Sequence, residues 1–242
     1  MDLGLKDAIV LIVGGSGYIG REVARQFASE GAQVVIAGRD QQHLDDATKQ
    51  LAVDAHRHAV DSCVMDTGST ASVASAIGEV MTRYGKLDVV VLSAAPAAQT
   101  LDPAKGFDPD AVLQAVDAKS IGYLRVANAA LPVISRPGRI VFIDGQGATL
   151  TGNIATSLRN RAVMTISKNL ADAAAGTGLT VNVVNPGHVT DNPITEPKCG
   201  TSPDVTPAQV ASVVVFLASQ PASGISGEDV AVGHRAFGLI PA

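Results

Sequence analysis

Short apolar runs alternate with longer segments of helical periodicity along nearly the whole chain. The apolar runs are of strand length, most are rich in Val and Ile, and they span residues 8–13, 33–37, 87–92, 139–143, 179–184 and 229–233. Residues 56–60 are a further, short strand candidate. The helical segments recur between them, at residues 18–30, 41–51, 69–84, 110–131, 156–175 and 207–219. Continuous apolar strands joined by helices predict a parallel sheet that is covered on both faces.

Right-handed crossover connections make a doubly wound arrangement the expected topology for such a chain. We therefore predict an α/β fold, a Rossmann-like doubly wound three-layer sandwich with a seven-stranded, mostly parallel sheet. No repeat or linker divides the sequence, so residues 1–242 are expected to form a single domain. Ligands of such sheets bind beyond the carboxyl ends of the strands, and the loops that follow the strands therefore carry the candidate chemistry.

A glycine-rich turn follows the first apolar run, where Gly14, Gly17 and Gly20 recur every third residue before a helical pattern. Glycines at this spacing make a tight turn, let a phosphate approach the backbone and let the helix pack close to the strand. The helix then directs its free N–H groups at the bound anion. The turn predicts a dinucleotide site formed by Gly14, Ser16, Gly17, Tyr18, Ile19 and Gly20. An ordinary strand-to-helix turn is the alternative, because the chain contains 24 glycines.

Composition excludes several other classes of protein. A net charge of −5 and the lack of a basic tract argue against a nucleic-acid partner or a membrane surface. The N-terminus lacks a signal-peptide pattern, and only Cys63 and Cys199 are present, so we expect a cytoplasmic protein without a disulfide framework. His56 and His58 share one strand face, but no third ligand accompanies them, and no metal site is predicted.

The end of the second strand indicates which dinucleotide would bind. A carboxylate there would accept a ribose 2′-hydroxyl, whereas a cation would bind a 2′-phosphate. Gly38 occupies the position of the acid, Arg39 follows with a planar fork suited to phosphate, and Asp40 comes one residue late. The sequence therefore favours NADP(H) over NAD(H), with a solvated loop arginine as the alternative interpretation.

Several segments in order resemble the short-chain dehydrogenase/reductase family. They are the glycine turn, Asp66, residues 85–95, residues 138–141, residues 182–187, and residues 206–211 with 216–219. The resemblance runs from Lys6 to about Gly233 and implies a homodimer or homotetramer built on helices 110–131 and 156–175. It further implies cofactor contacts from Asp66, Thr67, Ser93, Ala94, Ala95, Pro186, Gly187, His188 and Val189.

The chain departs from this family where its chemistry resides. The resemblance implies a Ser after the fifth strand and a Tyr-x-x-x-Lys on the next helix, with the Tyr as general acid/base. Here Asp144 or Gly145 replaces the Ser, and Thr156 and Asn160 stand at the Tyr and Lys positions. A register two residues later would give Leu158 and Ala162 instead. Neither register supplies a tyrosine, and a threonine hydroxyl is too weak an acid to substitute directly.

Two residues could take over the proton transfer. Lys119 stands where the family has a structural Asn, its Val-Asp-x-Lys segment resembles a family branch that has also lost the Tyr, and low-dielectric walls could lower its pKa. Asp144 is a second candidate, because burial could raise its pKa. A salt-bridged helix lysine and a capping aspartate are the structural alternatives. If the two side chains meet, they would form a proton relay; Asn160 could still hydrogen-bond the ribose.

Three further residues near this segment have weaker functional interpretations. Arg159 and Arg161 are not four residues from Thr156, so we expect them to point away from the cofactor, toward solvent or a partner subunit. His188 either faces the substrate or is a surface histidine.

Three functions stay open at this stage. The first is an NADP(H)-dependent oxidoreductase that acts on a small, largely apolar carbonyl or alkene with a non-standard proton donor. The second is a non-redox enzyme, such as a dehydratase, isomerase or cyclase, that keeps the cofactor-shaped pocket. The third is a catalytically inactive dinucleotide-binding subunit. A small substrate lid is expected near residues 190–206 in either enzyme.

Overall fold

The computed structural model describes residues 2–54, 60–94, 107–149, 153–194, 196 and 204–234. A seven-stranded sheet has the order β3-β2-β1-β4-β5-β6-β9, and all of its pairs are parallel. Its strands are β1 (Ile9–Val13), β2 (Gln33–Gly38), β3 (Asp61–Val64), β4 (Val89–Leu92), β5 (Gly138–Ile143), β6 (Leu179–Pro186) and β9 (Asp229–Val232). The predicted fold class is confirmed, with a fully parallel main sheet.

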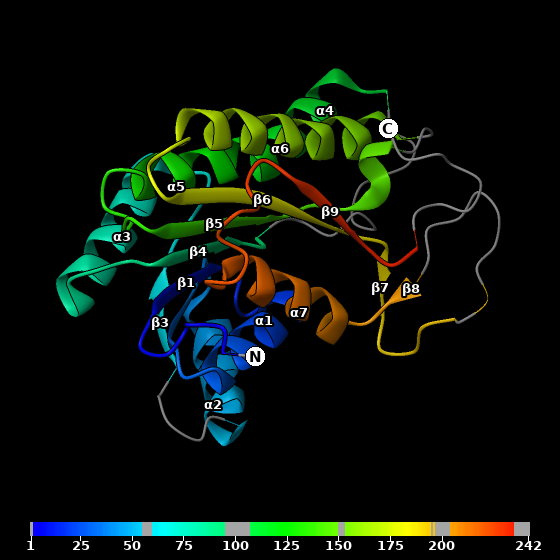
Figure 1. Cartoon of the computed structure of the whole chain (residues 1–242). Helices are drawn as coiled ribbons and strands as arrows, with labels where there is room; N and C mark the ends of the chain where they lie inside the picture. The colour runs from blue at the N-terminus through cyan, green and yellow to red at the C-terminus, as the bar shows by residue number, and fades with distance from the viewer. Residues whose placement is uncertain are drawn as a thin grey trace.

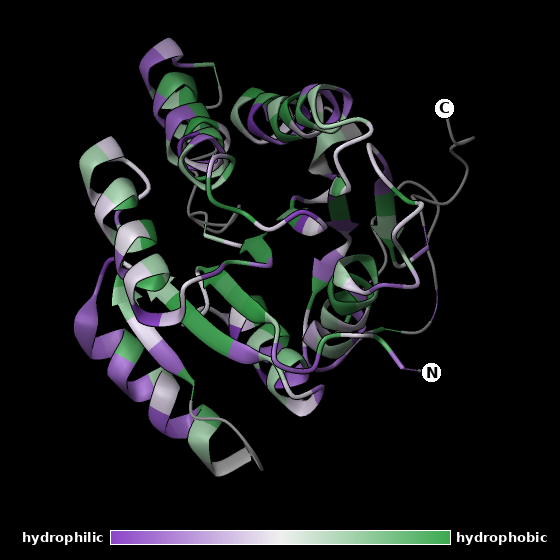
Figure 2. Cartoon of the chain, turned by 60° about the vertical axis from the view of Figure 1, so that its left-hand side comes forward, coloured by the Kyte–Doolittle hydropathy of each residue, from purple (hydrophilic) through white to green (hydrophobic). Residues whose placement is uncertain are grey.

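Helices cover both faces of the sheet and make the three layers seen in Figure 1. They are α1 (Tyr18–Ser29), α2 (Gln41–Asp54), α3 (Thr70–Tyr84), α4 (Pro109–Val116), α5 (Gly122–Ala130), α6 (Ile154–Ala173) and α7 (Pro207–Ala218). One core packs α3, α5 and α6 on one face, and a second core packs α1, α2 and α7 on the other. Figure 2 shows the hydrophobic strands between helices whose outer sides are more polar.

The strands are almost entirely buried because each lies between these two cores. β1, β4 and β5 expose none of their residues, which explains the uninterrupted apolar sequences of β1 and β4 and the apolar residues 140–143 of β5. Helix ends follow local chemistry as well: the Ser69 hydroxyl caps α3 by accepting the Ser72 N–H, and Gly85 ends that helix in the left-handed conformation with φ of 73°.

Two expected elements differ in the structure. The third strand was predicted at residues 56–60, and the structure has β3 at Asp61–Val64; residues 55–59 lie outside the described part of the chain, and Val60 is not part of the strand. β3 is a short edge strand that begins with polar Asp61 and Ser62, so it offers little apolar pattern to detect. The predicted helix 110–131 is divided by a π-helical turn at Asp117–Ile121, directly before Gly122.

A second, two-stranded sheet follows β6 and pairs β7 (His188–Val189) with β8 (Asp204–Val205). The main sheet reverses its strand order between β1 and β4, where the crossovers leave in opposite directions. In doubly wound sheets this switch point opens a crevice at the carboxyl ends of the strands. Within the described ranges, no helix has the length and apolar character that a bilayer crossing requires.

Candidate functional site

The glycine turn after β1 lies against the end of β4 with no room for side chains. Gly14 has φ of 87°, and a Cβ there would lie 2.5 Å from the backbone nitrogen of Ala94. A Cβ on Gly20 would lie 2.1 Å from the carbonyl oxygen of Gly14, so α1 packs directly on the turn. Ser93 joins the same contact, because its N–H donates to the Val13 carbonyl at 2.8 Å. The turn and the end of β4 thus form one continuous backbone cradle.

The start of α1 suits an anion. Gly17 is its N-cap, and no side chain caps the helix, so the N–H groups of the first turn, from Tyr18 to Gly20, are left for an external acceptor. Ser16 lies beside Gly38 at the end of β2, where a Cβ on Gly38 would be 3.5 Å from the Ser16 hydroxyl. A cradle closed to side chains and an uncapped helix fit the diphosphate of a dinucleotide.

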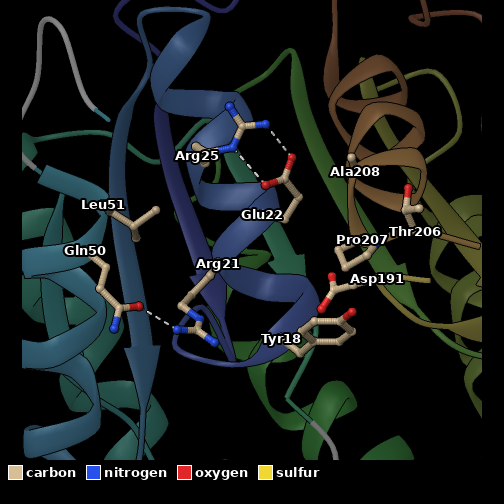
Figure 3. Close-up of a pocket in the computed structure, with 10 residues that line it drawn as sticks. All are labelled: Tyr18, Arg21, Glu22, Arg25, Gln50, Leu51, Asp191, Thr206, Pro207 and Ala208. Carbon is tan, nitrogen blue, oxygen red and sulfur yellow. Dashed lines mark hydrogen bonds and ion pairs between the residues drawn. The ribbon is translucent and has the colours of Figure 1, made fainter. Parts of the chain in front are cut away.

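Tyr18 contributes only its backbone to this cradle. Its side chain is 43% exposed and lines a separate surface pocket of about 390 Å³ between α1, α2 and the start of α7. Figure 3 shows Asp191 beside the Tyr18 ring and Arg21 bonded to Gln50 on the opposite wall. A hydrogen bond to Asp191 raises the pKa of Tyr18 to about 12, so this phenol is a poor proton donor near neutral pH.

Two charged residues follow β2: the basic Arg39, and Asp40, whose carboxylate caps the next helix. Arg39 is exposed directly after the strand. Asp40 instead caps α2, because its Oδ1 accepts the His43 N–H at 3.0 Å, and this bond holds the pKa of Asp40 below its usual range. The carboxylate is therefore committed to the helix.

The loop after β3 carries two of the predicted cofactor contacts, Asp66 and Thr67. Asp66 is exposed and its Oδ1 accepts the Gly68 N–H at 2.9 Å. The carbonyl of Thr67 accepts a hydrogen bond from Arg125, and this ties the loop to α5. Ala95, a further predicted contact, lies outside the described residues, as do His56 and His58.

A buried polar cluster lies at the ends of β4 to β6, next to the switch point. Lys119 Nζ donates to Asp144 Oδ1 at 3.0 Å and to Asn160 Oδ1 at 2.9 Å. The amide of Asn160 in turn donates to the Gly145 carbonyl at 3.2 Å. These residues come from the π-helical turn, the end of β5 and α6. The Lys119 and Asp144 side chains are therefore in contact, as a proton relay between them would require.

Burial controls the charges of this pair. The Lys119 side chain is 5% exposed and the Asp144 side chain 0%. Burial raises the pKa of Asp144 to about 7, although attraction to Lys119 opposes the shift. Burial likewise lowers the pKa of Lys119, and attraction to Asp144 opposes that shift. Both groups therefore exchange protons more readily near neutral pH than their exposed counterparts would.

α6 also carries Thr156 and Asn160, which stand at the positions of the tyrosine and the lysine that the family resemblance implies. Thr156 lies one helical turn before Asn160, and its N–H is bound by the capping Asn153. The expectation that Arg159 faces solvent or a partner is wrong, because this residue is only 3% exposed and interacts electrostatically with Tyr123 and Asp144. Burial lowers the pKa of Arg159. Arg161 is exposed, as expected.

The end of β6 carries the remaining predicted contacts. Pro186 is buried at the strand end, and the N–H of Gly187 donates to Val232 in β9. His188 begins β7 with a 56% exposed side chain, and its Nδ1 lies 2.9 Å from Asp204 Oδ1. Val189 packs against the core beneath α1 and α7.

The sequence analysis missed two polar residues beside the cluster. Asn185 is 3% exposed at the end of β6, and its amide nitrogen donates to Asp229 Oδ2 in β9 at 3.3 Å. Two features of the sequence could have indicated these residues. Asn185 interrupts an apolar strand directly before Pro186, and Asp229 is the first residue of the last strand.

Comparison with known proteins extends the similarity over most of the chain. A family model described as enoyl-(acyl carrier protein) reductase matches residues 15–234. The (2S)-[(R)-hydroxy(phenyl)methyl]succinyl-CoA dehydrogenase subunit BbsC of Thauera aromatica is 30% identical over 236 residues, which cover 93% of this chain and 92% of that protein.

Solved structures show the same architecture. A short-chain type dehydrogenase/reductase from Mycobacterium ulcerans superposes with a TM-score of 0.84 at 25% identity, over 95% of this chain and 90% of that chain. The L-sorbose reductase of Gluconobacter frateurii, complexed with NADPH and L-sorbose, has a TM-score of 0.86 at 21% identity, over 99% and 100% of the two chains. With its glycine cradle, its doubly wound parallel sheet and these matches, the chain belongs to the short-chain dehydrogenase/reductase family of oxidoreductases, which bind nicotinamide dinucleotides.

Proposed function

We propose that this protein is an NADP(H)-dependent oxidoreductase that acts on a small, largely apolar carbonyl or alkene and takes its proton from Lys119 and Asp144. The observation that carries the proposal is the buried contact of these two side chains beside the switch point, at 3.0 Å. Within the family resemblance, Thr156 and Asn160 occupy the positions of the missing Tyr and Lys. No tyrosine of this chain is available in α6.

The dinucleotide would be held by the cradle around Gly14 and Gly20, by the first turn of α1 and by the loops after β3, β4 and β6. Arg39 supports the choice of NADP(H), because it is exposed at the end of β2 while Asp40 is committed to capping α2. When bound, a nicotinamide dinucleotide supplies or accepts a hydride. Asn160 would orient the Lys119 ammonium, which it already binds at 2.9 Å.

Lys119 and Asp144 would hold the proton that reduction consumes. Asp144 has a pKa of about 7 and Lys119 a lowered one, so the pair can give up a proton near neutral pH and regain it afterwards. Alkene reduction places a smaller demand on an acid than carbonyl reduction does. The enoyl reductase description of the matching family model supports the alkene alternative.

The binding step is tested by titrating the protein with NADPH and with NADH and following the nucleotide fluorescence. Tighter binding of NADPH is expected, and no binding at millimolar nucleotide would exclude the proposal. Turnover is then tested on a panel of carbonyls and enones with Asp144→Asn and Lys119→Met. Both variants should bind NADPH but turn over at least tenfold more slowly; unchanged turnover in both would exclude the relay.

A second candidate is a catalytically inactive dinucleotide-binding subunit. It is favoured by the absence of a tyrosine from α6 and by the name of the 30% identical relative, which is one subunit of a dehydrogenase. Tight NADPH binding without turnover on any substrate of the panel would support this function. Turnover of a non-redox substrate would instead support a dehydratase, isomerase or cyclase.

We further propose a homodimer or homotetramer built on α4, α5 and α6, and a small lid near residues 190–206. Exposed apolar residues on α4 and α6 support the first, since Leu113 is 66% and Leu158 49% exposed. The β7–β8 pair and the contact between His188 and Asp204 support the second, because they join both ends of the segment. Residues 195 and 197–203 of that segment lie outside the described part of the chain. Light scattering tests the oligomer, and substrate KM after shortening the segment tests the lid.

A further inference from the structure

We propose that Asn185 couples Asp144 to Asp229 and that the two carboxyl groups hold one proton between them in the folded chain. Asp144 belongs to the cluster described above, whereas Asn185 and Asp229 lie behind it, at the ends of β6 and β9. The proposal concerns the protein without substrate or dinucleotide. It therefore stands or falls separately from the proposed oxidoreductase activity.

Asp144 and Asn185 are direct neighbours across two parallel strands. Ile143 of β5 pairs with Val184 of β6, and the Asp144 N–H donates to the Val184 carbonyl at 2.8 Å, so the ladder continues one residue further. Neighbouring strands lie about 4.8 Å apart. Phe142 and Val183, two residues earlier, both lie in the core beneath α6, and the Asp144 and Asn185 side chains share that face.

Two buried hydrogen-bond acceptors on this shared face lack a donor. Oδ2 of Asp144 and Oδ1 of Asn185 are both buried, and neither has a hydrogen-bond partner among the residues that the structure describes. The orientation of the Asn185 amide is set by Asp229, because its Nδ2 donates to Asp229 Oδ2 at 3.3 Å. An ionised Asp144 would leave its Oδ2 unsatisfied beside a carbonyl oxygen, which is costly in a buried site.

The chemistry of an amide resolves this conflict. An amide has one donor end and one acceptor end, whereas an ionised carboxylate only accepts. Asn185 can therefore satisfy one ionised and one protonated carboxyl group, but not two ionised ones. In the observed orientation Asp229 is ionised, and the proton lies on Asp144 Oδ2 and donates to Asn185 Oδ1. If the amide turns over, Asp144 loses its proton, Asp229 gains one, and the total stays at one.

The surrounding charges leave this proton in place. Among the residues that the structure describes, Lys119 from the π-helical turn binds Oδ1 of Asp144, Arg159 from α6 also favours the ionised form, and Tyr123 of α5 is a further titratable neighbour. Burial and the charge of Asp229 favour the protonated form. Asp229 is half-buried in the edge strand β9, so the shared proton has an exit to the sheet edge.

The decisive variant is Asp229→Asn in the full-length protein. An amide at position 229 can donate to Asn185 Oδ1, which frees Asn185 to turn its Nδ2 toward an ionised Asp144. The proton on Asp144 should then dissociate at a pH lower by about one unit or more. The carboxyl ¹³C resonance of Asp144, assigned by its loss in Asp144→Asn, reports this midpoint.

Two controls separate the amide from simple charge repulsion. Glu228→Gln removes the same charge from an exposed neighbour and should leave the Asp144 midpoint nearly unchanged. In an Asn185→Leu background, or Asn185→Ala if that variant does not fold, Asp229→Asn should move the midpoint by much less than in the parent. An equal movement in both backgrounds, or none in the parent, would overturn the proposal.

Discussion

The two ends of the candidate site are built on opposite principles. The cradle around Gly14 and Gly20 exists because side chains are missing, and backbone atoms of the turn, α1 and β4 approach one another where no Cβ would fit. The cluster around Lys119 and Asp144 exists because two charged side chains are paired and buried inside the protein. Backbone geometry therefore defines the first end, and desolvated charge defines the second.

This difference determines how each end responds to change. The cradle tolerates no added atom but carries no titratable group, so its effects should be steric and independent of pH. The cluster tolerates changes of shape better than the loss of one charge, because the remaining charge would stay buried. Variants at the two ends should therefore separate in their dependence on pH.

Lys119→Met should have the largest effect. It removes the cation that faces Asp144, and the free energy of unfolding should fall by about 3–5 kcal/mol above pH 7. Below pH 7 the loss should shrink, because the pKa of Asp144 is raised to about 7 and its proton neutralises the carboxyl group. Denaturant unfolding across this pH range measures both. Lys86→Met, which breaks the exposed pair with Asp88, should cost at most about 1 kcal/mol.

Gly20→Ala should come next. The new methyl group would lie 2.1 Å from the Gly14 carbonyl oxygen, so the turn must shift at a cost of about 1–3 kcal/mol at every pH, and dinucleotide affinity should fall at least tenfold. Gly78→Ala is the matched control, because nothing lies within 4 Å of its Cβ position in α3, and it should stabilise the protein by about 1 kcal/mol. Equal effects of the two variants would contradict the close packing.

Arg39→Ala should have a smaller, selective effect. Loss of a charge-assisted bond to a 2′-phosphate should weaken NADPH binding about tenfold or more and leave NADH binding unchanged. Fluorescence titration with both nucleotides measures the ratio, and the exposed Arg161→Ala serves as the charge control. Equal weakening of both nucleotides would argue against a phosphate contact.

Asp40→Ala should have the smallest effect. Its carboxylate caps α2 through the His43 N–H, so the expected cost is about 1 kcal/mol of stability without a change in nucleotide preference. Thermal unfolding together with the two nucleotide titrations measures this. A switch in preference would show that Asp40, and not Arg39, faces the ribose.

The sequence predicted the sheet well because its strands are apolar on both faces. The same reasoning failed at β3, an edge strand that begins with Asp61 and Ser62 and has little apolar pattern to detect. The glycine turn was equally readable, since each missing side chain has a local geometric reason. The roles in dinucleotide binding and proton transfer that we assign to the residues of the glycine turn and of the rest of the site remain predictions.

The charged cluster was only partly predictable. Lys119 and Asp144 were recognised as candidates, but their contact spans 25 positions of the chain and depends on tertiary structure. Arg159 was misjudged because spacing along α6 does not reveal that this side chain is buried and interacts with Tyr123 and Asp144. Asn185 escaped notice because one polar residue in an apolar strand has no periodicity of its own.

The π-helical turn at Asp117–Ile121 also sets the helical phase of the site. A π turn accommodates one residue more than an α-helical turn, and the residues on its two sides differ by about 100° from a continuous helix. Lys119 lies within this turn, between α4 and α5. Deletion of a single residue, such as Ala118, would restore a regular helix and rotate either α4 or Lys119 out of register with Asp144. The position of the Lys119 ammonium group thus depends on the extra residue in the π-helical turn as well as on the lysine itself.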